Sequence, residues 1–165
     1  MLKVRGDNKY NATKVAFNAR TKEFCDYQWA KNYLNQNDRI IFDSKLEANV
    51  FSHLLKHFEL EQIEVHKPIY LYKGNRYYPA QHWNVDFRVT LSSNNFRLIE
   101  VKGFVTESFK WQLKYMSVAN ERLLYNLTIV TSNEPSKLQK KLGLIDHSLP
   151  IIHSRNVDRY IEKLR

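Results

Sequence analysis

The chain has 165 residues, 43% of them hydrophobic, so it is about the size of one globular domain and apolar enough to exclude wholesale disorder. Its single cysteine, Cys25, excludes an internal disulfide and a zinc site made from several cysteines. The 26 Lys and Arg against 17 Asp and Glu give a net charge of +9, which favours a polyanionic partner such as DNA; a basic protein without such a partner is the alternative.

The sequence also lacks the marks of a membrane or secreted protein. No apolar run approaches the ~18 residues of a membrane helix. The stretch "MLKVRGDNKYNATK" has no apolar segment of the kind found in secretory signals. We therefore expect no membrane partner and a cytoplasmic location.

The first 42 residues carry weak secondary-structure signals and are treated as an N-terminal extension. We expect a loose basic arm over residues 1–12 and a short strand over 13–18. Residues 23–36 have apolar side chains at helical spacing, which leaves a helix or a hairpin open.

A helix is predicted over residues 43–58, with Ser44 at its N-cap and an apolar stripe formed by Val50, Phe51, Leu54 and Phe58. Glu47 falls within that stripe. One interpretation is a capping box, in which Glu47 reaches back to the Ser44 amide. The other is a carboxylate that serves a functional site, because a charge aimed at the core is costly without a partner.

The remaining segments alternate between strand and helix patterns, which predicts an α/β fold with a central mixed β-sheet flanked by helices. Pro68 indicates that the first of these strands is an edge or irregular strand. The predicted elements are an extended segment over 63–72, a hairpin of strands 83–91 and 96–103 joined at "SSNN", a helix over 106–124, a buried strand over 127–132, a helix over 134–143 ending at Gly143, a strand over 149–154 and a helix over 156–165. We expect one domain, 1–165, with its core over 43–131 and C-terminal helices and a strand over 132–165.

Three charged residues stand on the two hairpin strands. Alternation along a strand puts Glu100 and Lys102 on one face, and hairpin pairing brings Asp86 close to Glu100. Two carboxylates held together repel unless a cation lies between them, and oxygen ligands suit Mg²⁺ or Mn²⁺. A neighbouring lysine can orient or deprotonate a water, or stabilise charge developing on a phosphate. The alternative is an exposed sheet face with a cross-strand salt bridge.

The ordered set of a helix Glu, a strand Asp and a Glu-x-Lys resembles the PD-(D/E)XK nuclease superfamily, with "VD" at 85–86 and "EVK" at 100–102. The stretches "FDSKLEA" (42–48) and "IEVKGFVTESFKWQLK" (99–114) resemble small phage-encoded endonucleases, including Holliday-junction resolvases like phage endonuclease I. Val85 stands where the superfamily's name has Pro. The resemblance covers residues 42–131.

This resemblance implies a restriction-endonuclease-like core and a role for each matched residue. Asp86 and Glu100 are implied to bind the metal, Lys102 to act in catalysis, and Glu47 to assist a metal or its water. Together they form the expected catalytic set, with Mg²⁺ or Mn²⁺ as cofactor.

The predicted helix over 106–124 is the expected DNA contact. Lys110 and Lys114 lie one turn apart on one face, suited to a phosphate backbone, and Arg122 follows on the same helix. Gln112 is expected to contact DNA or the site. A solvated helix face is the alternative.

The function expected from these residues is a metal-dependent endodeoxyribonuclease. We expect it to be encoded by a phage or mobile element, to lie in the host cytoplasm if a phage encodes it, and to act on branched or recombination and replication DNA. The alternative is a catalytically silent DNA-binding module of a replication or packaging complex. A homodimer is a further expectation, because two symmetrical cuts in a four-way junction require two sites. Its anchors would be aromatic residues of the extension, which core packing explains equally well: Phe24, Tyr27, Trp29 and Tyr33.

Overall fold

The computed structural model describes residues 13–144 and 149–164. The chain divides into two compact units, Met1–Phe51 and Ser52–Arg165, and each is described by itself. The basic arm expected over residues 1–12 lies outside the described residues. Within the described ranges, no helix has the length and apolarity that crossing a membrane requires.

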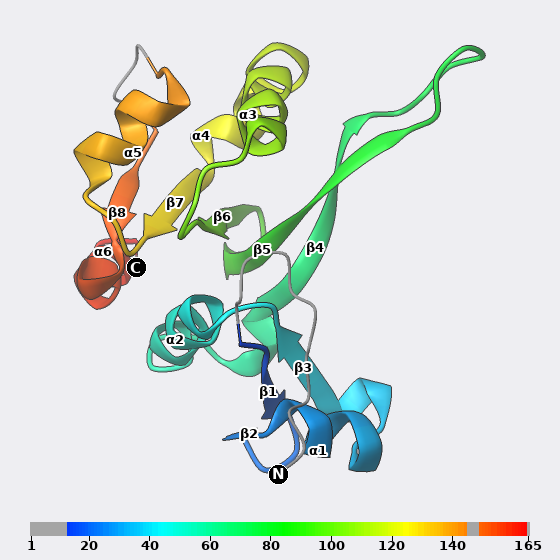
Figure 1. The fold of residues 1–165 in the computed structure, drawn as a ribbon, viewed down its shortest axis with the longest axis vertical. Helices are drawn as coiled ribbons and strands as arrows, with labels where there is room; N and C mark the ends of the chain where they lie inside the picture. Colours follow the sequence, from blue (N-terminus) through cyan, green and yellow to red (C-terminus); the bar gives the residue numbers. More distant parts are fainter. Residues whose placement is uncertain (1–12, 145–148, 165) are drawn as a thin grey trace, which may run out of the picture. The chain divides into compact units, whose positions relative to one another are not determined.

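The first unit contains a three-stranded antiparallel sheet in the order β2-β1-β3 (Figure 1). The strand expected over residues 13–18 is confirmed as β1. The segment 23–36, for which helix and hairpin were both open, contains both, because β2 pairs back onto β1 before α1 begins. The elements are β1 (Val15–Asn18), β2 (Glu23–Cys25), α1 (Tyr27–Tyr33), the 3₁₀ turn η1 (Gln36–Asp38) and β3 (Arg39–Phe42).

Aromatic packing forms the core of this unit. The Phe17 ring lies edge-on to those of Phe24 and Phe51, with centroids 5.2 and 5.1 Å apart, and Phe42 completes the group. Phe24 therefore has a packing role. Trp29 and Tyr33 are 45% and 74% exposed, and dimerisation through this region stays a prediction.

Helix α2 (Lys45–Leu54) begins in the first unit and ends in the second. The predicted apolar stripe is confirmed, because Val50, Phe51, Leu54 and Phe58 are all buried. The helix starts directly after Ser44, whose hydroxyl accepts from the Glu47 amide at 3.1 Å. Ser44 is thus the N-cap that the sequence predicts.

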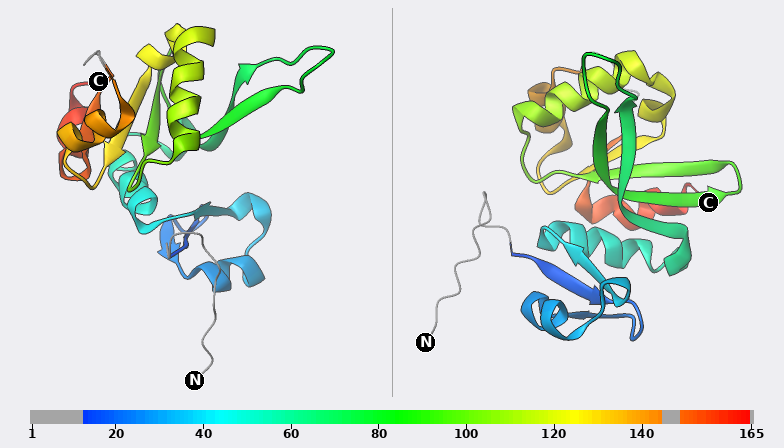
Figure 2. Two further views of the ribbon diagram at one scale, coloured as in Figure 1. Left: turned by 45° about the horizontal axis from the view of Figure 1, so that its top comes forward. Right: turned by 90° about the vertical axis from the view of Figure 1, so that its right-hand side faces the viewer.

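The second unit is built on a five-stranded mixed sheet in the order β4-β5-β6-β7-β8 (Figure 2). Neighbours β4, β5 and β6 pair antiparallel, whereas β6, β7 and β8 pair parallel. The mixed sheet expected from the sequence is therefore present, and β4, which carries Pro68, is an edge strand as predicted. The strands are β4 (Ile63–Tyr72), β5 (Gln81–Ser92), β6 (Asn95–Val101), β7 (Leu127–Thr131) and β8 (Ile151–His153).

Helices cover this sheet on both faces. Beneath α3 and α5 lies an apolar cluster that includes Leu98, Phe109, Leu113, Ile129 and Leu138. On α6, Tyr160 shares a 2.6 Å hydrogen bond with Thr128 of β7. The five residues of β7 are all buried, as expected of a central strand with both faces covered. The helices are α3 (Glu107–Ala119), α4 (Glu121–Tyr125), α5 (Pro135–Leu142) and α6 (Val157–Glu162), with 3₁₀ turns η2 (Leu60–Gln62) and η3 (Ser154–Asn156).

The helix predicted over residues 106–124 is two helices. Thr106 caps α3 by accepting from the Phe109 amide at 3.1 Å. The chain leaves helical geometry at Asn120, whose side chain caps the next helix by accepting from the Leu123 amide. Arg122 consequently lies on α4 and not on the helix that carries Lys110. An Asn side chain that bonds its own backbone competes with helix continuation, which explains the break.

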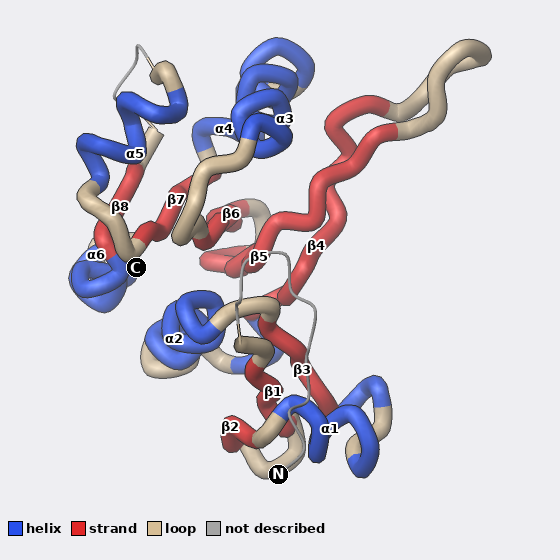
Figure 3. The backbone as a smooth tube through the Cα atoms, in the orientation of Figure 1, coloured by secondary structure: helices blue, strands red, loops and turns tan. Residues whose placement is uncertain are grey.

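The ends of β4 and β5 extend beyond β6 as a two-stranded arm, residues 69–83 (Figures 1 and 3). Its tip is an ordered turn in which the Asn75 side chain accepts from the amides of Tyr77 and Tyr78. Gly74 has φ +83°, and a Cβ there would lie 2.7 Å from the Ala80 nitrogen. Only glycine fits this position without displacing the backbone.

Burial in the sheet predicts which side chains contribute most to the free energy of unfolding. Replacing Ile129, which is fully buried on β7, by Ala should lower the free energy of unfolding by about 2–5 kcal/mol, because it removes apolar contacts and leaves a cavity. Val118→Ala on α3, where the side chain is 88% exposed, is the matched control and should change it by less than about 0.5 kcal/mol. Urea unfolding followed by circular dichroism measures both; equal effects would contradict the packing described.

Candidate active site

Strands β5 and β6 separate at the point where Asp86 and Glu100 lie. The last pair of their ladder on this side is Phe87 with Ile99, after which β5 continues beside β4 alone. Asp86 Oδ2 accepts from the Val101 amide at 2.6 Å, and Glu100 Oε2 accepts from the Asp86 amide at 3.3 Å. Asp86 thus supplies an acceptor for the Val101 amide just beyond the last pair of the ladder, and the two carboxylates link the strands there. We call this point, with Asp86, Glu100 and Lys102, the fork.

Glu100 is buried, with 2% of its surface exposed. The alternative of an exposed sheet face therefore does not describe it. Ile99 and Val101 are also buried, as expected, so both faces of β6 are covered. A buried carboxylate needs a compensating charge, and the Lys102 ammonium lies 2.5 Å from Glu100 Oε1.

Lys102 is positioned by two neighbouring elements. Its amide donates to the Val130 carbonyl of β7 at 2.8 Å, directly after the end of β6. Its ammonium lies over the Phe109 ring of α3, 4.8 Å from the centroid, and that ring packs edge-on against Trp83 at 5.8 Å. The predicted trio of Asp86, Glu100 and Lys102 is thus brought together by β5, β6 and the start of α3.

His66 is a neighbour of Asp86 that the sequence analysis did not single out. It lies opposite Asp86 in the register of β4 and β5, between the pairs Val65 with Phe87 and Lys67 with Val85. A ring nitrogen of His66 and a carboxylate oxygen of Asp86 lie within 4.8 Å of each other. His66 has φ +52°, a strained value for a residue other than glycine. Extending the predicted hairpin register to residues 63–72 would have placed His66 opposite Asp86. The positive φ of His66 has no signal in the sequence.

An ion-pair cluster adjoins the fork on the β4 side. Glu64 accepts hydrogen bonds from Lys67 and from Arg88, its directly paired residue on β5. Burial raises the pKa of Glu64, but the hydrogen bonds and charges of Lys67 and Arg88 outweigh that effect and hold the pKa below its ordinary value of 4.5. The carboxylate keeps Arg88 against β4, two residues from Asp86.

Glu47 lies in the first unit and makes a modified capping box. Its Oε2 accepts from the Asp43 amide at 2.9 Å and its Oε1 from the Ser44 hydroxyl at 3.0 Å. The capping box expected from the sequence has Glu47 accepting from the Ser44 amide. In the structure the carboxylate accepts instead from the amide of Asp43, one residue earlier. Glu47 belongs to the first unit and the fork to the second, and the participation of Glu47 in the site stays a prediction.

The expected DNA-binding residues divide between two sides of α3. At about 100° per residue, Lys110 and Lys114 lie about 40° apart, whereas Gln112 lies about 200° from Lys110. Lys110 is paired with Glu107 at 2.7 Å, and the Lys114 ammonium lies 5.2 Å from the centre of the Trp111 ring. The two lysines therefore share a face of α3, as expected, whereas Gln112 lies on another; DNA contact by the three residues stays a prediction.

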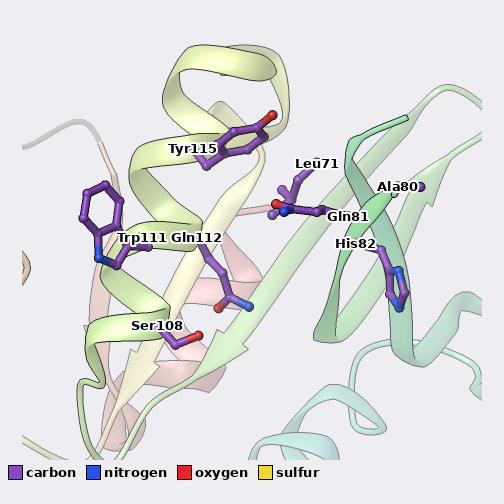
Figure 4. A pocket seen from close by; sticks show the side chains of 8 residues that line it. All are labelled: Leu71, Ala80, Gln81, His82, Ser108, Trp111, Gln112 and Tyr115. Atoms are coloured by element: carbon purple, nitrogen blue, oxygen red, sulfur yellow. The ribbon is translucent and has the colours of Figure 1, made fainter. Parts of the chain in front are cut away.

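Gln112 instead faces a hollow between α3 and the arm (Figure 4). The hollow has a volume of about 550 Å³, within the range of small-molecule sites. Figure 4 shows the Gln112 side chain extending toward the strands and the Gln81 amide pointing toward the helix. The lining residues are Leu71, Ala80, Gln81, His82, Ser108, Trp111, Gln112 and Tyr115.

Comparison of the chain with protein-family models, curated proteins and solved structures finds no match in any of the three. The geometry of the fork and its surroundings is therefore the basis for inferring a function.

The Glu64 cluster predicts a pH dependence of stability. A carboxylate whose pKa is depressed by folding contributes stability that is complete above its unfolded pKa, 4.5, and is lost as the pH falls through the lower folded value. Glu64→Gln should therefore destabilise the protein at neutral pH, and the difference from wild type should shrink below about pH 4.5.

Urea midpoints from about pH 3 to about pH 7 measure this difference. Glu61→Gln, an exposed position just before β4, is the control and should change the midpoint little at any pH. A wild-type advantage over Glu64→Gln that stays constant across the range would contradict the prediction.

Proposed function

We propose that the chain is a Mg²⁺- or Mn²⁺-dependent endodeoxyribonuclease of the PD-(D/E)XK type that acts on branched or recombination and replication DNA. The observation that carries the proposal is the fork: Asp86 and Glu100 held within hydrogen-bond reach of each other's strand, with Lys102 at 2.5 Å from Glu100. A phage or mobile-element origin and a place in the host cytoplasm belong to the same proposal.

The groups at the fork fit a divalent cation. Two carboxylates against one ammonium leave a net negative charge, and Asp86 and Glu100 supply the oxygen ligands that Mg²⁺ and Mn²⁺ prefer. His66, close to Asp86, adds a ligand type that Mn²⁺ accepts more readily than Mg²⁺. When bound, the metal would polarise a phosphate oxygen and activate a water as nucleophile.

The chain's own residues would supply the remaining electrostatics. Lys102, held over Phe109 and against Glu100, places a positive charge beside the carboxylates. There it can orient the attacking water or stabilise the charge that develops on the phosphate. The order of elements, a hairpin followed by a helix and a parallel buried strand, also supports a restriction-endonuclease-like core.

A catalytically silent DNA-binding module is the second candidate, and one observation favours it. Both carboxylates accept backbone hydrogen bonds, and Lys102 compensates Glu100, so the fork is electrostatically accounted for by protein groups. In that case Asp86 and Glu100 would be structural, and metal binding separates the two candidates.

The central prediction concerns cleavage. Wild-type protein should cut flapped or four-way DNA in Mg²⁺ or Mn²⁺ but not in chelator. Asp86→Asn and Glu100→Gln should each lower cleavage by at least about 100-fold, because an amide is a poor ligand for a hard cation. Both amides keep an oxygen acceptor, so the backbone hydrogen bonds of the fork should largely persist. Glu100→Gln also removes the charge partner of Lys102, so circular dichroism checks that this variant folds.

Isothermal titration with Mn²⁺ provides a readout apart from activity, and both variants should bind it more weakly than wild type. Linear, single-stranded, flapped and four-way DNA identify the preferred substrate, and Glu61→Gln is the matched control. Retention of wild-type cleavage and Mn²⁺ binding by both variants would refute the site.

A separate prediction concerns Glu47. Glu47→Gln should lower cleavage strongly with little loss of stability, because the amide can still accept from the Asp43 amide and bond the Ser44 hydroxyl. Ser44→Ala is the complementary variant: it should cost about 0.5–2 kcal/mol of stability through the lost cap and leave the carboxylate in place. Single-turnover cleavage and urea unfolding measure the two effects. Unchanged cleavage by Glu47→Gln would assign Glu47 to capping alone.

A further inference from the structure

The hollow between α3 and the arm is separate from the carboxylate fork and has walls of mixed chemistry. One wall comes from the start of β5 and the end of β4, and the other from a face of α3 that differs from its buried face. On that face Ser108, Gln112 and Tyr115 lie within about 60° of one another. The hollow therefore presents the amides of Gln81 and Gln112 beside the exposed ring of Tyr115, whereas the Trp111 ring projects from the opposite side of α3 (Figure 4).

We propose that this hollow binds one unpaired base of a single-stranded DNA segment. The amides of Gln81 and Gln112 each offer donors and an acceptor, which is what the hydrogen-bonding edge of a base requires. Tyr115, 39% exposed, offers a ring face on which a base can stack. The proposal deepens the nuclease function by naming its substrate feature, and it rests on that function.

The arm has the composition of a surface that holds a nucleic-acid strand. Residues 69–83 contain four tyrosines, Lys73 and Arg76, and no Asp or Glu, while Trp83 at the base of the arm is buried. Tyr70, Tyr77 and Tyr78 are each at least 65% exposed, an unusual density of exposed rings. The Arg76 guanidinium lies 4.5 Å from the centre of the Tyr77 ring. Basic groups beside exposed rings suit phosphates alternating with bases.

The charge of the chain also bears on what the hollow binds. The net charge is +9. The residues lining the hollow include no acidic side chain. A basic chain with no acidic side chain in the lining favours a polyanion, such as a nucleic-acid strand, over an uncharged ligand.

An unpaired strand fits better than a duplex for a geometric reason. A base inside a duplex turns its pairing edge toward its partner and its faces toward its neighbours, so it must leave the stack to enter a hollow. A base in a single-stranded flap or at a branch has already left its partner and loses less free energy. Gln81 lies five residues before Asp86 on β5, about 17 Å away, so a bound base would sit near the fork.

Fluorescence anisotropy in chelator tests the inference. Fluorescein-labelled single-stranded DNA, duplex DNA of the same sequence and single-stranded RNA are titrated with wild-type protein and with Tyr115→Ala and Gln112→Ala. Tyr125→Ala, an exposed ring on α4, is the matched control and should leave binding unchanged. Tyr115→Ala and Gln112→Ala should each weaken single-stranded DNA binding, Tyr115→Ala by about 5- to 150-fold, and duplex binding by less than about twofold. Circular dichroism confirms that each variant folds.

A second readout uses DNA with a single 2-aminopurine, whose emission reports stacking. Wild-type protein should change that emission, and Tyr115→Ala should remove the change. Equal losses for single-stranded and duplex DNA, or tighter binding of RNA than of DNA, would overturn the proposal.

Failure of the base-binding proposal and failure of the nuclease proposal give different results. Loss of single-stranded binding in the variants, with no cleavage by wild type in Mg²⁺ or Mn²⁺, would support the base site and refute the nuclease. Normal cleavage with unchanged single-stranded binding in the variants would overturn the base site and leave the nuclease standing.

Discussion

The buried Glu100 carboxylate is the constraint on which the second unit depends. A charge with 2% exposure is tolerable only with a partner, and Lys102 supplies it from the first residue after β6. Lys102 is fixed in turn by the β7 backbone and the Phe109 ring, so the pair ties the sheet to α3. Apolar residues of similar volume could fill the same space without a desolvation cost, and a catalytic role would explain why the chain has an ion pair there instead.

The fork lies where the ladder between β5 and β6 ends. An unsatisfied buried amide costs about 1–3 kcal/mol. Asp86 accepts from the Val101 amide and Glu100 from the Asp86 amide, which fixes both carboxylates through the backbone. The other oxygen of Glu100 lies 2.5 Å from the Lys102 ammonium. The nuclease and the silent binding module thus share the same hydrogen bonds and ion pair at the fork. They differ in whether the fork binds a metal.

Much of this arrangement follows from sequence, for identifiable reasons. Alternation and hairpin register suffice to bring Asp86, Glu100 and Lys102 together, and an apolar stripe suffices for α2. The burial of Glu100 does not follow, because α3 and β7 cover it from distant parts of the chain. The left-handed backbone of His66 and the break at Asn120 depend on local geometry that competes with the regular pattern. The opposite placement of Gln112 and Lys110 follows from helical periodicity alone.

The five buried residues of β7 and the two-stranded arm mark opposite ends of a gradient in local stability. Strand β7 has a hydrogen-bonded neighbour on each side and a covered surface above and below, so its amides can exchange with solvent only when the unit unfolds. The arm has strand neighbours only within itself and many exposed side chains, so its amides can open in local fluctuations. The arm can therefore deform around a bound molecule while the carboxylate fork, anchored to β6 and β7, keeps its geometry.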